Sequence, residues 1–299
     1  MNPLLINVAL TGMVPTTKDN PNVPVTPEAI AADVRRCYDA GASVFHIHAR
    51  NTDETPAYEA EKFREIIDAI HSAVSDPNIV LCVTTSGRTH NTLECRSDVL
   101  RLDGPYKPDM ASLTLGSMNF PKQASVNSPD MISGLAMRMQ ERGIVPELEV
   151  FELGMINYSQ YLLKKGILKQ PLYYNLLLGS LGTIAATPIN LAMLVQALPD
   201  GATWAATGIG QYQFEVNTWA ITTGGHVRVG LEDGIFMDRA KTDLGSNARM
   251  VERVVKVARA IGREPASSLE ARAIIGLPRR RVSTPRNGKG IVHGMIGAR

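Results

Sequence analysis

The sequence predicts a single (β/α)₈ TIM barrel, an α/β fold in which eight parallel strands close into a cylinder surrounded by helices. Short apolar segments alternate with helical segments eight times along the chain. No linker rich in proline, glycine or serine divides them, and 299 residues with 44% hydrophobic composition can bury one large core. The competing architecture is a doubly wound open sheet, in which the eighth strand lies at an edge instead of pairing with the first.

The expected strands are short runs of β-branched, aromatic and other apolar residues bounded by turn residues. They span residues 6–10, 44–48, 80–84, 110–115, 147–151, 173–177, 203–206 and 226–230. Helices are expected to begin near Pro27, Ala57, Thr92, Ser128, Met155, Pro188, Phe214 and Leu244. Ser128 and Thr187 each precede a proline, a pattern typical of an N-cap residue followed by the first helical turn.

The charge distribution separates a mildly acidic body from a basic C-terminus. The last 21 residues carry six basic residues and no acid, which leaves 25 basic and 29 acidic residues in the rest of the chain. We therefore expect a barrel domain over residues 1–278 and a basic tail over 279–299. The acidic body argues against a nucleic-acid groove. For the tail we expect a solvated arm, ahead of an oligomer contact or a nucleic-acid tether.

Cysteine content and hydropathy indicate the cellular compartment. The chain has three cysteines, too few and too widely spaced for a disulfide framework or a structural zinc site. The first residues lack the charged and apolar regions of a signal peptide, and the longest apolar stretch, 172–198, is interrupted by asparagine, glycine and proline. We expect a cytoplasmic protein that keeps its thiols reduced and has no membrane segment.

Two histidines stand at the end of the second expected strand. Because side chains alternate along a strand, His46 and His48 point to the same side. Two imidazoles on one face near the C-terminal end of a barrel strand indicate a metal site at the mouth of the barrel. The alternative is a buried strand that holds two hydrogen-bonded histidines without a metal, so a third ligand must decide.

Glu232 is the candidate third ligand, because it lies just beyond the eighth expected strand. In a closed barrel this strand is two positions away from the second, across the first, which lets the carboxylate meet His46 and His48. Two histidines and a carboxylate form an open zinc site, and iron and manganese also accept this set. The alternative is a surface turn at Glu232 and Asp233. Arg228, four residues earlier, points inward if His226 does.

Four ordered motifs resemble those of the β-keto acid cleavage enzyme family. They are the His-x-His run at 46–48, the stretch Ser-Leu-Thr-x-Gly-Ser-x-Asn-Phe at 112–120, Pro-Glu-Leu-Glu-Val-Phe at 146–151, and Gly-His-Val-Arg-Val-Gly-Leu-Glu-Asp at 225–233. The resemblance extends from about residue 6 to residue 277. The tail lies outside it.

This resemblance implies a zinc-dependent enzyme that condenses a β-keto acid with acetyl-CoA and returns acetoacetate and the CoA thioester of the shortened acid. It implies that His46, His48 and Glu232 bind zinc, although another divalent metal is possible. It also implies that Arg228 and Asp233 are the catalytic arginine and aspartate. A carboxylate beside a cation has a lowered pKa and stays ionised, so we expect Arg228 to keep Asp233 available as a base.

The resemblance also implies one small hydroxyl after the third strand and another after the fourth. The first is Thr85 or Ser86, because residues 84–88 replace a Ser-Thr-Gly-Gly pattern of the family. The second is Thr114, with Ser112 on the same face of the strand as its alternative. The hydroxyls are expected to stabilise alkoxide intermediates.

Three further expectations concern the cosubstrate, the ion pairs and the assembly. Gly208 and Gly210 follow the seventh strand, where barrels often bind phosphate through backbone N–H groups, although a tight turn explains them equally. Arg228 has an alternative role as a structural ion pair with Glu147 or Glu149. The resemblance and the basic tail favour a homo-oligomer, either a dimer or a tetramer.

The chain departs from the family at the end of the first strand. The studied member whose substrate carries an ammonium group has an acidic residue there, whereas this chain reads Thr-Gly-Met-Val-Pro at 11–15. Burying an ammonium against Val14 would cost several kcal/mol, so we expect a substrate without an amine. Arg88, where the motif has glycine, is expected to bind a second carboxylate or a polar substituent. Its alternative is a loop arginine that pairs with Asp53 or Glu54.

Two rival functions remain open from the sequence. A metal-dependent aldolase or related lyase that acts without CoA can use the same metal, base and arginine. A non-catalytic barrel that binds a small acid through its metal would retain the three ligands but tolerate loss of Asp233. The presence of Asp233, Arg228 and the hydroxyls together argues against this binding protein.

Overall fold

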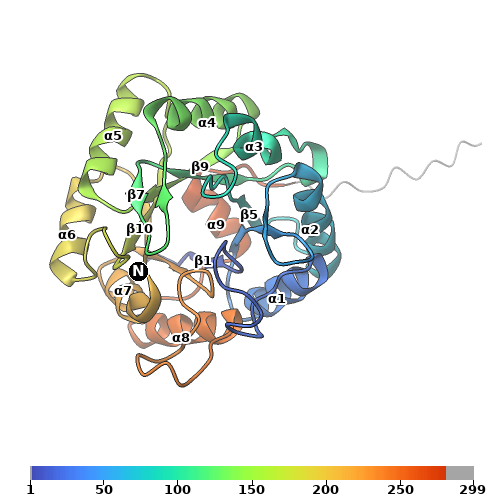
Figure 1. Cartoon of the computed structure of the whole chain (residues 1–299). Helices are drawn as coiled ribbons and strands as arrows, with labels where there is room; N and C mark the ends of the chain where they lie inside the picture. The colour runs from blue at the N-terminus through green and yellow to red at the C-terminus, as the bar shows by residue number, and fades with distance from the viewer. Residues whose placement is uncertain (1, 281–299) are drawn as a thin grey trace, which may run out of the picture.

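The computed structural model describes residues 2–280, and the eight expected strands form one closed barrel of parallel strands (Figure 1). In chain order they are β1 (Ile6–Ala9), β2 (Val44–Ile47), β5 (Val80–Val83), β6 (Met110–Thr114), β9 (Val145–Val150), β10 (Tyr173–Leu178), β11 (Thr203–Gly208) and β12 (His226–Val229). Two short antiparallel pairs lie outside the barrel: β3 (Ala49–Arg50) with β4 (Pro56–Ala57), and β7 (Met118–Asn119) with β8 (Ala124–Ser125).

The barrel closes through the first and last of these strands. β1 pairs with β12 in parallel, with Ile6 opposite Val227 and Val8 opposite Val229, and it pairs with β2 on its other side. The open doubly wound sheet is therefore excluded, because its last strand would have a free edge. The expected (β/α)₈ barrel is confirmed.

Helices α1 to α8 surround the barrel in the order of the chain, and α9 lies across one end of it (Figure 1). They are α1 (Pro27–Asp39), α2 (Ala60–Ala73), α3 (Leu93–Ser97), α4 (Pro129–Arg142), α5 (Leu153–Lys164), α6 (Pro188–Ala197), α7 (Gln213–Thr222), α8 (Asn247–Ala260) and α9 (Ser268–Ile275). Three short 3₁₀ helices are η1 (Asp98–Arg101), η2 (Gly104–Tyr106) and η3 (Gly210–Tyr212). The two expected N-caps are present, because the Ser128 hydroxyl accepts from the N–H of Met131 and the Thr187 hydroxyl from that of Asn190.

Helix α9 is an element that the sequence reading did not predict. It begins with a capping box between Ser267 and Glu270. Its residues Ala271 and Ile275 pack in one apolar cluster with residues from the N-terminal ends of the strands, among them Leu5. The helix therefore closes the N-terminal end of the barrel, and Figure 1 shows it behind the strands.

The barrel interior changes character from one end to the other. Strand residues that face the surrounding helices, such as Ile6 and Val8, are apolar and fully buried. Inward residues toward the C-terminal end are polar, and Asn7, Glu147 and Arg228 are also buried. Such groups require partners inside the barrel, since a buried charge without one is costly.

Two expectations concern the chain outside the barrel. Residues 281–299 of the expected tail lie outside the described part of the chain, so the division at residue 278 stays a prediction. At the boundary, Arg280 contacts Asp109 with an Nη2 to Oδ1 distance of 3.0 Å. Within residues 2–280, no helix is both long enough and apolar enough to cross a membrane.

Candidate functional site

Two imidazoles lie together at the C-terminal end of β2. His46 and His48 are both buried, and their Nε2 atoms are 3.2 Å apart. They point to the same side of the chain, as the alternation of a strand predicts. Nδ1 of His46 lies 2.7 Å from Oε2 of Glu147. Because a carboxylate only accepts, this contact places a ring proton on Nδ1 and directs Nε2 toward His48.

Glu232 completes this group from the loop after β12. Its Oε1 lies 3.4 Å from Nε2 of His48, and its Oε2 lies 3.8 Å from Nε2 of His46. Gly12 permits this approach, because a Cβ there would come within 2.5 Å of the Glu232 Cγ, and its φ is +65°. Within the described residues, Oε2 of Glu232 is buried without a hydrogen-bond partner.

These three side chains fit a divalent metal ion. Their ligand atoms, two nitrogens and one oxygen, all lie within 4.8 Å of one another. A buried carboxylate oxygen without a partner is costly, and a cation is the group that would satisfy it. Burial lowers the pKa of His48 to about 4, so its imidazole is neutral at neutral pH, which is the form that binds a metal.

A second group of potential ligands consists of His46, Cys82 and Glu147. Its members satisfy one another, because the Cys82 thiol donates to the same Glu147 oxygen that contacts His46, at 3.3 Å. Burial raises the pKa of the Cys82 thiol well above its ordinary value, so the thiol keeps its proton. Burial opposes the charge of Glu147, yet its contact with His46 lowers the carboxyl pKa to about 2. We assign this group to orienting His46.

Arg228 forms the charged centre of the site. Its side chain is buried and points inward from β12, where Nε donates to Oδ2 of Asp233 at 2.8 Å and Nη2 donates to Oε1 of Glu232 at 2.7 Å. Nη1 lies 3.5 Å from Oε1 of Glu149 and 3.8 Å from Oε2 of Glu147. The expected pairing with Asp233 and the alternative pairing with β9 therefore coexist in one network.

The structure corrects the expected pKa of Asp233. We expected Arg228 to lower it, but burial outweighs that contact and raises it above the ordinary value, and the nearby Glu232 raises it further. For Glu232, by contrast, His48 and Arg228 overcome burial and hold the pKa well below its usual range. The site thus contains one carboxylate that keeps its negative charge and one that accepts a proton more readily, a combination suited to general base chemistry.

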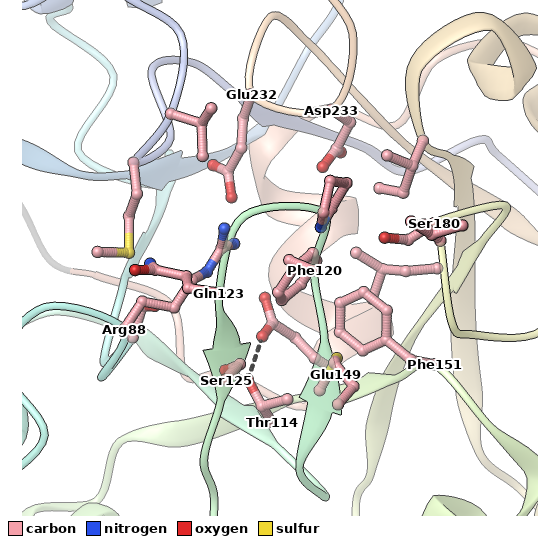
Figure 2. A pocket seen from close by; sticks show the side chains of 18 of the residues that line it. Arg88, Thr114, Phe120, Gln123, Ser125, Glu149, Phe151, Ser180, Glu232 and Asp233 are labelled. Atoms are coloured by element: carbon pink, nitrogen blue, oxygen red, sulfur yellow. Dashed lines mark hydrogen bonds between the residues drawn. The ribbon is translucent and has the colours of Figure 1, made fainter.

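The structure separates the candidate hydroxyls into two pairs. The Thr85 hydroxyl donates to the carbonyl of Ser112 at 2.6 Å, and the Ser112 hydroxyl accepts from the N–H of Thr85 at 3.1 Å. Those two side chains join β5 to β6 and do not line the cavity at the barrel mouth. Ser86 and Thr114 do line it. Thr114 donates to Oε2 of Glu149 at 2.6 Å, as the dashed line in Figure 2 shows. The geometry therefore favours Ser86 over Thr85 and Thr114 over Ser112.

The expected phosphate contacts at Gly208 and Gly210 also require correction. The N–H of Gly210 donates to the carbonyl of Asp233 at 2.5 Å, so it is not free to bind a phosphate. A Cβ on Gly208 would lie 2.2 Å from the carbonyl oxygen of Tyr212, which explains the glycine by close packing. The tight-turn alternative accounts for both residues, because η3 begins at Gly210.

One cavity of about 650 Å³ opens over the candidate metal centre. Val14 forms part of its rim and is 61% exposed. Arg88 lines the cavity with its guanidinium 4.0 Å from the centre of the Phe120 ring. The alternative for Arg88 is not observed, because within residues 2–280 its guanidinium forms no ion pair with Asp53 or Glu54, whose carboxylates accept from Thr55 and Thr17. Other lining residues, several of them shown in Figure 2, are Met13, His48, Gln123, Ser125, Phe151, Leu181 and Ile209.

Sequence reasoning missed part of the site on β9. Glu147 and Glu149 appeared only as alternative partners of Arg228, yet Glu147 orients His46 and Glu149 accepts the hydroxyl of Thr114. Two glutamates at i and i+2 in a strand point to one face. In a barrel strand, one face points into the barrel interior and the other packs against the helices. Either position would bury two glutamates on the same face, so their spacing already indicated carboxylates that need partners.

Comparison with known proteins gives a match along nearly the whole chain. The sequence pattern of the beta-keto acid cleavage enzyme family matches residues 3–277. The 3-keto-5-aminohexanoate cleavage enzyme of Acetoanaerobium sticklandii is 38% identical over 278 residues, covering 93% of this chain and 99% of that enzyme. The 3-oxoadipate:acetyl-CoA acetyltransferase of Cupriavidus necator is 37% identical over 280 residues, covering 92% and 95%.

A solved structure supports the same fold. The ternary complex of ObcA with a C4-CoA adduct and oxalate has a TM-score of 0.77 and 20% sequence identity, covering 86% of this chain and 68% of that one. The resemblance seen in the motifs is thus confirmed by full-length matches, and the chain is an enzyme that belongs to the beta-keto acid cleavage enzyme family.

Proposed function

We propose that this enzyme condenses a β-keto acid with acetyl-CoA and releases acetoacetate and the CoA thioester of the shortened acid. The observation that carries the proposal is that the His46, His48 and Glu232 ligand set adjoins the Arg228–Asp233 pair, with His48, Glu232, Arg228 and Asp233 lining one cavity. The names of the relatives support it, since one is an acetyl-CoA acetyltransferase acting on 3-oxoadipate and another cleaves 3-keto-5-aminohexanoate.

In this proposal His46, His48 and Glu232 hold a zinc ion, or another divalent metal that accepts the same ligands. The chemistry that such a site supplies when loaded is Lewis-acid stabilisation of developing enolate charge. Glu147 fixes the ring of His46, because its carboxylate lies 2.7 Å from Nδ1. The unpartnered oxygen of Glu232 is the structural feature that favours a cation here.

Asp233 is the proposed general base. It removes a proton from the carbon between the ketone and the carboxylate of the substrate, which makes that carbon a nucleophile toward the acetyl group. Arg228 holds the carboxylate through two donated hydrogen bonds, of 2.8 and 3.2 Å, and so fixes its direction. The raised pKa of Asp233 lies closer to neutral pH than that of an ordinary aspartate, which makes its carboxylate a stronger base toward the substrate proton.

Ser86 and Thr114 are the proposed hydroxyls that stabilise the tetrahedral alkoxide. Thr114 donates its one hydroxyl proton to Glu149, so it must release that hydrogen bond before it can donate to the alkoxide. Collapse of this alkoxide breaks the carbon–sulfur bond of acetyl-CoA and expels the CoA thiolate, which then adds to the original ketone. Collapse of the second alkoxide breaks the original carbon–carbon bond and leaves the shortened acyl group on CoA. The departing acetoacetate carbanion takes back the proton held by Asp233. Each bond that forms is matched by one that breaks, and no oxidant or reductant is needed.

The substrate is proposed to lack an amine. Met13 and Val14 form the wall at the end of β1, and the acids that line the cavity are Glu149, Glu232 and Asp233. All three contact Arg228. An ammonium group at the Val14 wall would therefore have no carboxylate of its own, which costs several kcal/mol if the group is buried.

We also propose a cytoplasmic homo-oligomer, either a dimer or a tetramer. The cysteines at 37, 82 and 95 are free thiols in the structure, which is consistent with a reducing compartment. Sedimentation of the purified protein would measure the subunit number.

The experiment is turnover of a panel of β-keto acids by the metal-loaded protein, with acetoacetate and new CoA thioesters followed by mass spectrometry. We expect acetoacetate only when acetyl-CoA is present. Acetoacetate or aldol cleavage without acetyl-CoA would instead favour the CoA-independent lyase. Binding of the acids without any turnover, unchanged in Asp233→Ala, would favour the non-catalytic binding protein.

A further inference from the structure

Arg88 is a cation in the cavity without a protein counter-ion. It forms no ion pair and donates no hydrogen bond among the residues 2–280, although its side chain lines the cavity. Its guanidinium lies 4.0 Å from the centre of the Phe120 ring, and Phe120 stands edge-on to Phe151. A cation–π contact at this distance restrains the guanidinium over the ring, while its N–H groups form no hydrogen bond within residues 2–280 and can bind a ligand.

The loop that carries Arg88 is held in place by hydrogen bonds from the buried Arg96. Nε of Arg96 donates to the carbonyl of Thr85 at 2.7 Å, and its Nη2 donates to Oδ1 of Asn127 at 2.8 Å. Gly87 leaves room for this buried arginine, because a Cβ there would lie 2.7 Å from the Arg96 Cδ. The backbone next to Arg88 is thus fixed before a ligand arrives, which lowers the entropy lost on binding.

No carboxylate of the cavity forms an ion pair with Arg88 within residues 2–280, although the charges of Glu232, Glu149 and Asp233 favour its charged form. Glu232 and Asp233 are bound by Arg228, and Glu149 accepts the hydroxyl of Thr114. Figure 2 shows these three carboxylates around the same cavity as Arg88. Burial lowers the pKa of the Arg88 guanidinium below its ordinary range in spite of their charges. A group in this position favours an added anion, which restores the stability of its charged form.

From these contacts we infer that Arg88 determines substrate specificity by binding a second carboxylate, so that the preferred substrate is a β-keto diacid. The inference rests on the proposed function and deepens it by naming the class of side chain. The fork of the guanidinium matches a carboxylate in a bidentate geometry, and the walls at Val14 and Leu181 are apolar and suit the methylene carbons between the two ends of the acid.

The test uses the metal-loaded enzyme, acetyl-CoA and two matched substrates: a β-keto diacid, and the β-keto monoacid of the same chain length that ends in a methyl group. We expect wild type to prefer the diacid. In Arg88→Gln we expect kcat/KM for the diacid to fall about 100-fold, mainly through KM, with less than about a threefold change for the monoacid. Arg88→Lys, which keeps the charge but not the fork, should lose about tenfold on the diacid.

Lys122→Gln is the matched control, because Lys122 is another cation that lines the cavity, at the exposed turn between β7 and β8. It should change the diacid-to-monoacid ratio less than about twofold, since an exposed charge acts only at long range. An equal loss for both acids in Arg88→Gln would overturn the inference, because Arg88 would then contact the shared carboxylate or acetyl-CoA. An unchanged ratio would overturn it as well.

Calorimetric titration of both acids without acetyl-CoA separates this inference from the proposed reaction. If neither acid is turned over, the proposed function fails, yet tighter binding of the diacid that disappears in Arg88→Gln still supports the carboxylate site. Equal affinities for the two acids in wild type would contradict the site directly.

Discussion

The two ends of the barrel interior differ in what their side chains do. At the N-terminal end, Leu5, Val44 and Val80 pack with Ile275 of α9 in a cluster of mainly apolar side chains that also contains Tyr173. At the C-terminal end, buried charges such as Glu147 and Arg228 fill the same cylinder. Apolar packing stabilises the fold without directional partners, whereas each buried charge needs a partner of fixed geometry. We infer from this difference that the apolar end mainly stabilises the fold, and we propose that the polar end carries the chemistry.

Substitution of Asp233, at the C-terminal end of the barrel, should produce the largest effect. It should lower activity and leave the stability of the fold nearly unchanged. We expect Asp233→Asn to lower kcat about 1,000-fold, equivalent to about 4 kcal/mol, because the amide cannot take up the substrate proton. Arg228 keeps its contact with Glu232 at 2.7 Å, so the fold should persist. Steady-state kinetics and circular dichroism measure the two parts. A variant that retains a tenth of the activity would assign the proton transfer to another residue.

Substitution of Ile275 tests the opposite end. Its side chain is 1% exposed in the apolar cluster, so Ile275→Ala should lower the free energy of unfolding by about 3 kcal/mol through lost burial and the cavity left behind. KM for the substrates should not change, because this residue lies at the closed end. Chemical denaturation and kinetics check both statements. A loss of activity larger than the loss of folded protein would show that the two ends are coupled.

The pH dependence of stability offers a third comparison. His226 stands at the N-terminal end of β12, accepts the N–H of Leu5 on Nδ1 at 3.0 Å, and has its pKa lowered by burial to about 4. The unfolded histidine, with a pKa near 6.5, binds a proton between about pH 6.5 and pH 4 while the folded one does not. Stability therefore falls as the pH falls through this window.

Relative to pH 7, this one group should remove roughly 2 kcal/mol of stability at pH 5. We expect His226→Gln to be less stable than wild type at pH 7 and to lose less of its stability on acidification. Urea unfolding at both pH values measures the difference. Parallel losses in wild type and variant would mean that His226 does not titrate in the way its burial indicates.

The smallest effect is expected at Thr85, which follows the C-terminal end of β5 but does not line the cavity. Its hydroxyl donates to the Ser112 carbonyl and does not line the cavity. We expect Thr85→Val to lower the free energy of unfolding by about 1 kcal/mol and to change kcat less than about threefold. Ser86→Ala, in contrast, should lower kcat about tenfold with little effect on stability. Reversal of the two outcomes would return the catalytic hydroxyl to Thr85.

The fold was largely predictable because its signals are local. Each barrel strand was located by apolar runs between turn residues, and the starts of α4 and α6 by Ser128 and Thr187 before proline. Helix α9 was missed because it is a short ninth helix outside the repeating strand–helix pattern. Its capping box at Ser267 and Glu270 was nevertheless a visible signal.

The candidate site was less predictable where the properties of a side chain depend on how deeply it is buried and on which residues of neighbouring strands lie beside it. His46, His48 and Glu232 were expected to meet because barrel closure brings their strands together. The direction of the Asp233 pKa was wrong because the sequence shows its nearness to Arg228 but not the depth of its burial.

The roles of Thr85 and Gly210 depended on partners that only the folded chain defines. The pairing of β5 with β6 brings the Thr85 hydroxyl to the Ser112 carbonyl. The loop after β12 brings the Asp233 carbonyl to the N–H of Gly210. Sequence spacing identifies neither contact, because each joins segments that are far apart along the chain.

The most direct test of the central claim is a transfer experiment with acetyl-CoA labelled with ¹³C in its acetyl group. If the enzyme joins that acetyl group to the carboxylate-bearing carbons of the β-keto acid, the label appears in acetoacetate and is absent from the new CoA thioester. Unlabelled acetoacetate, or cleavage that proceeds at the same rate without acetyl-CoA, would contradict the proposed reaction.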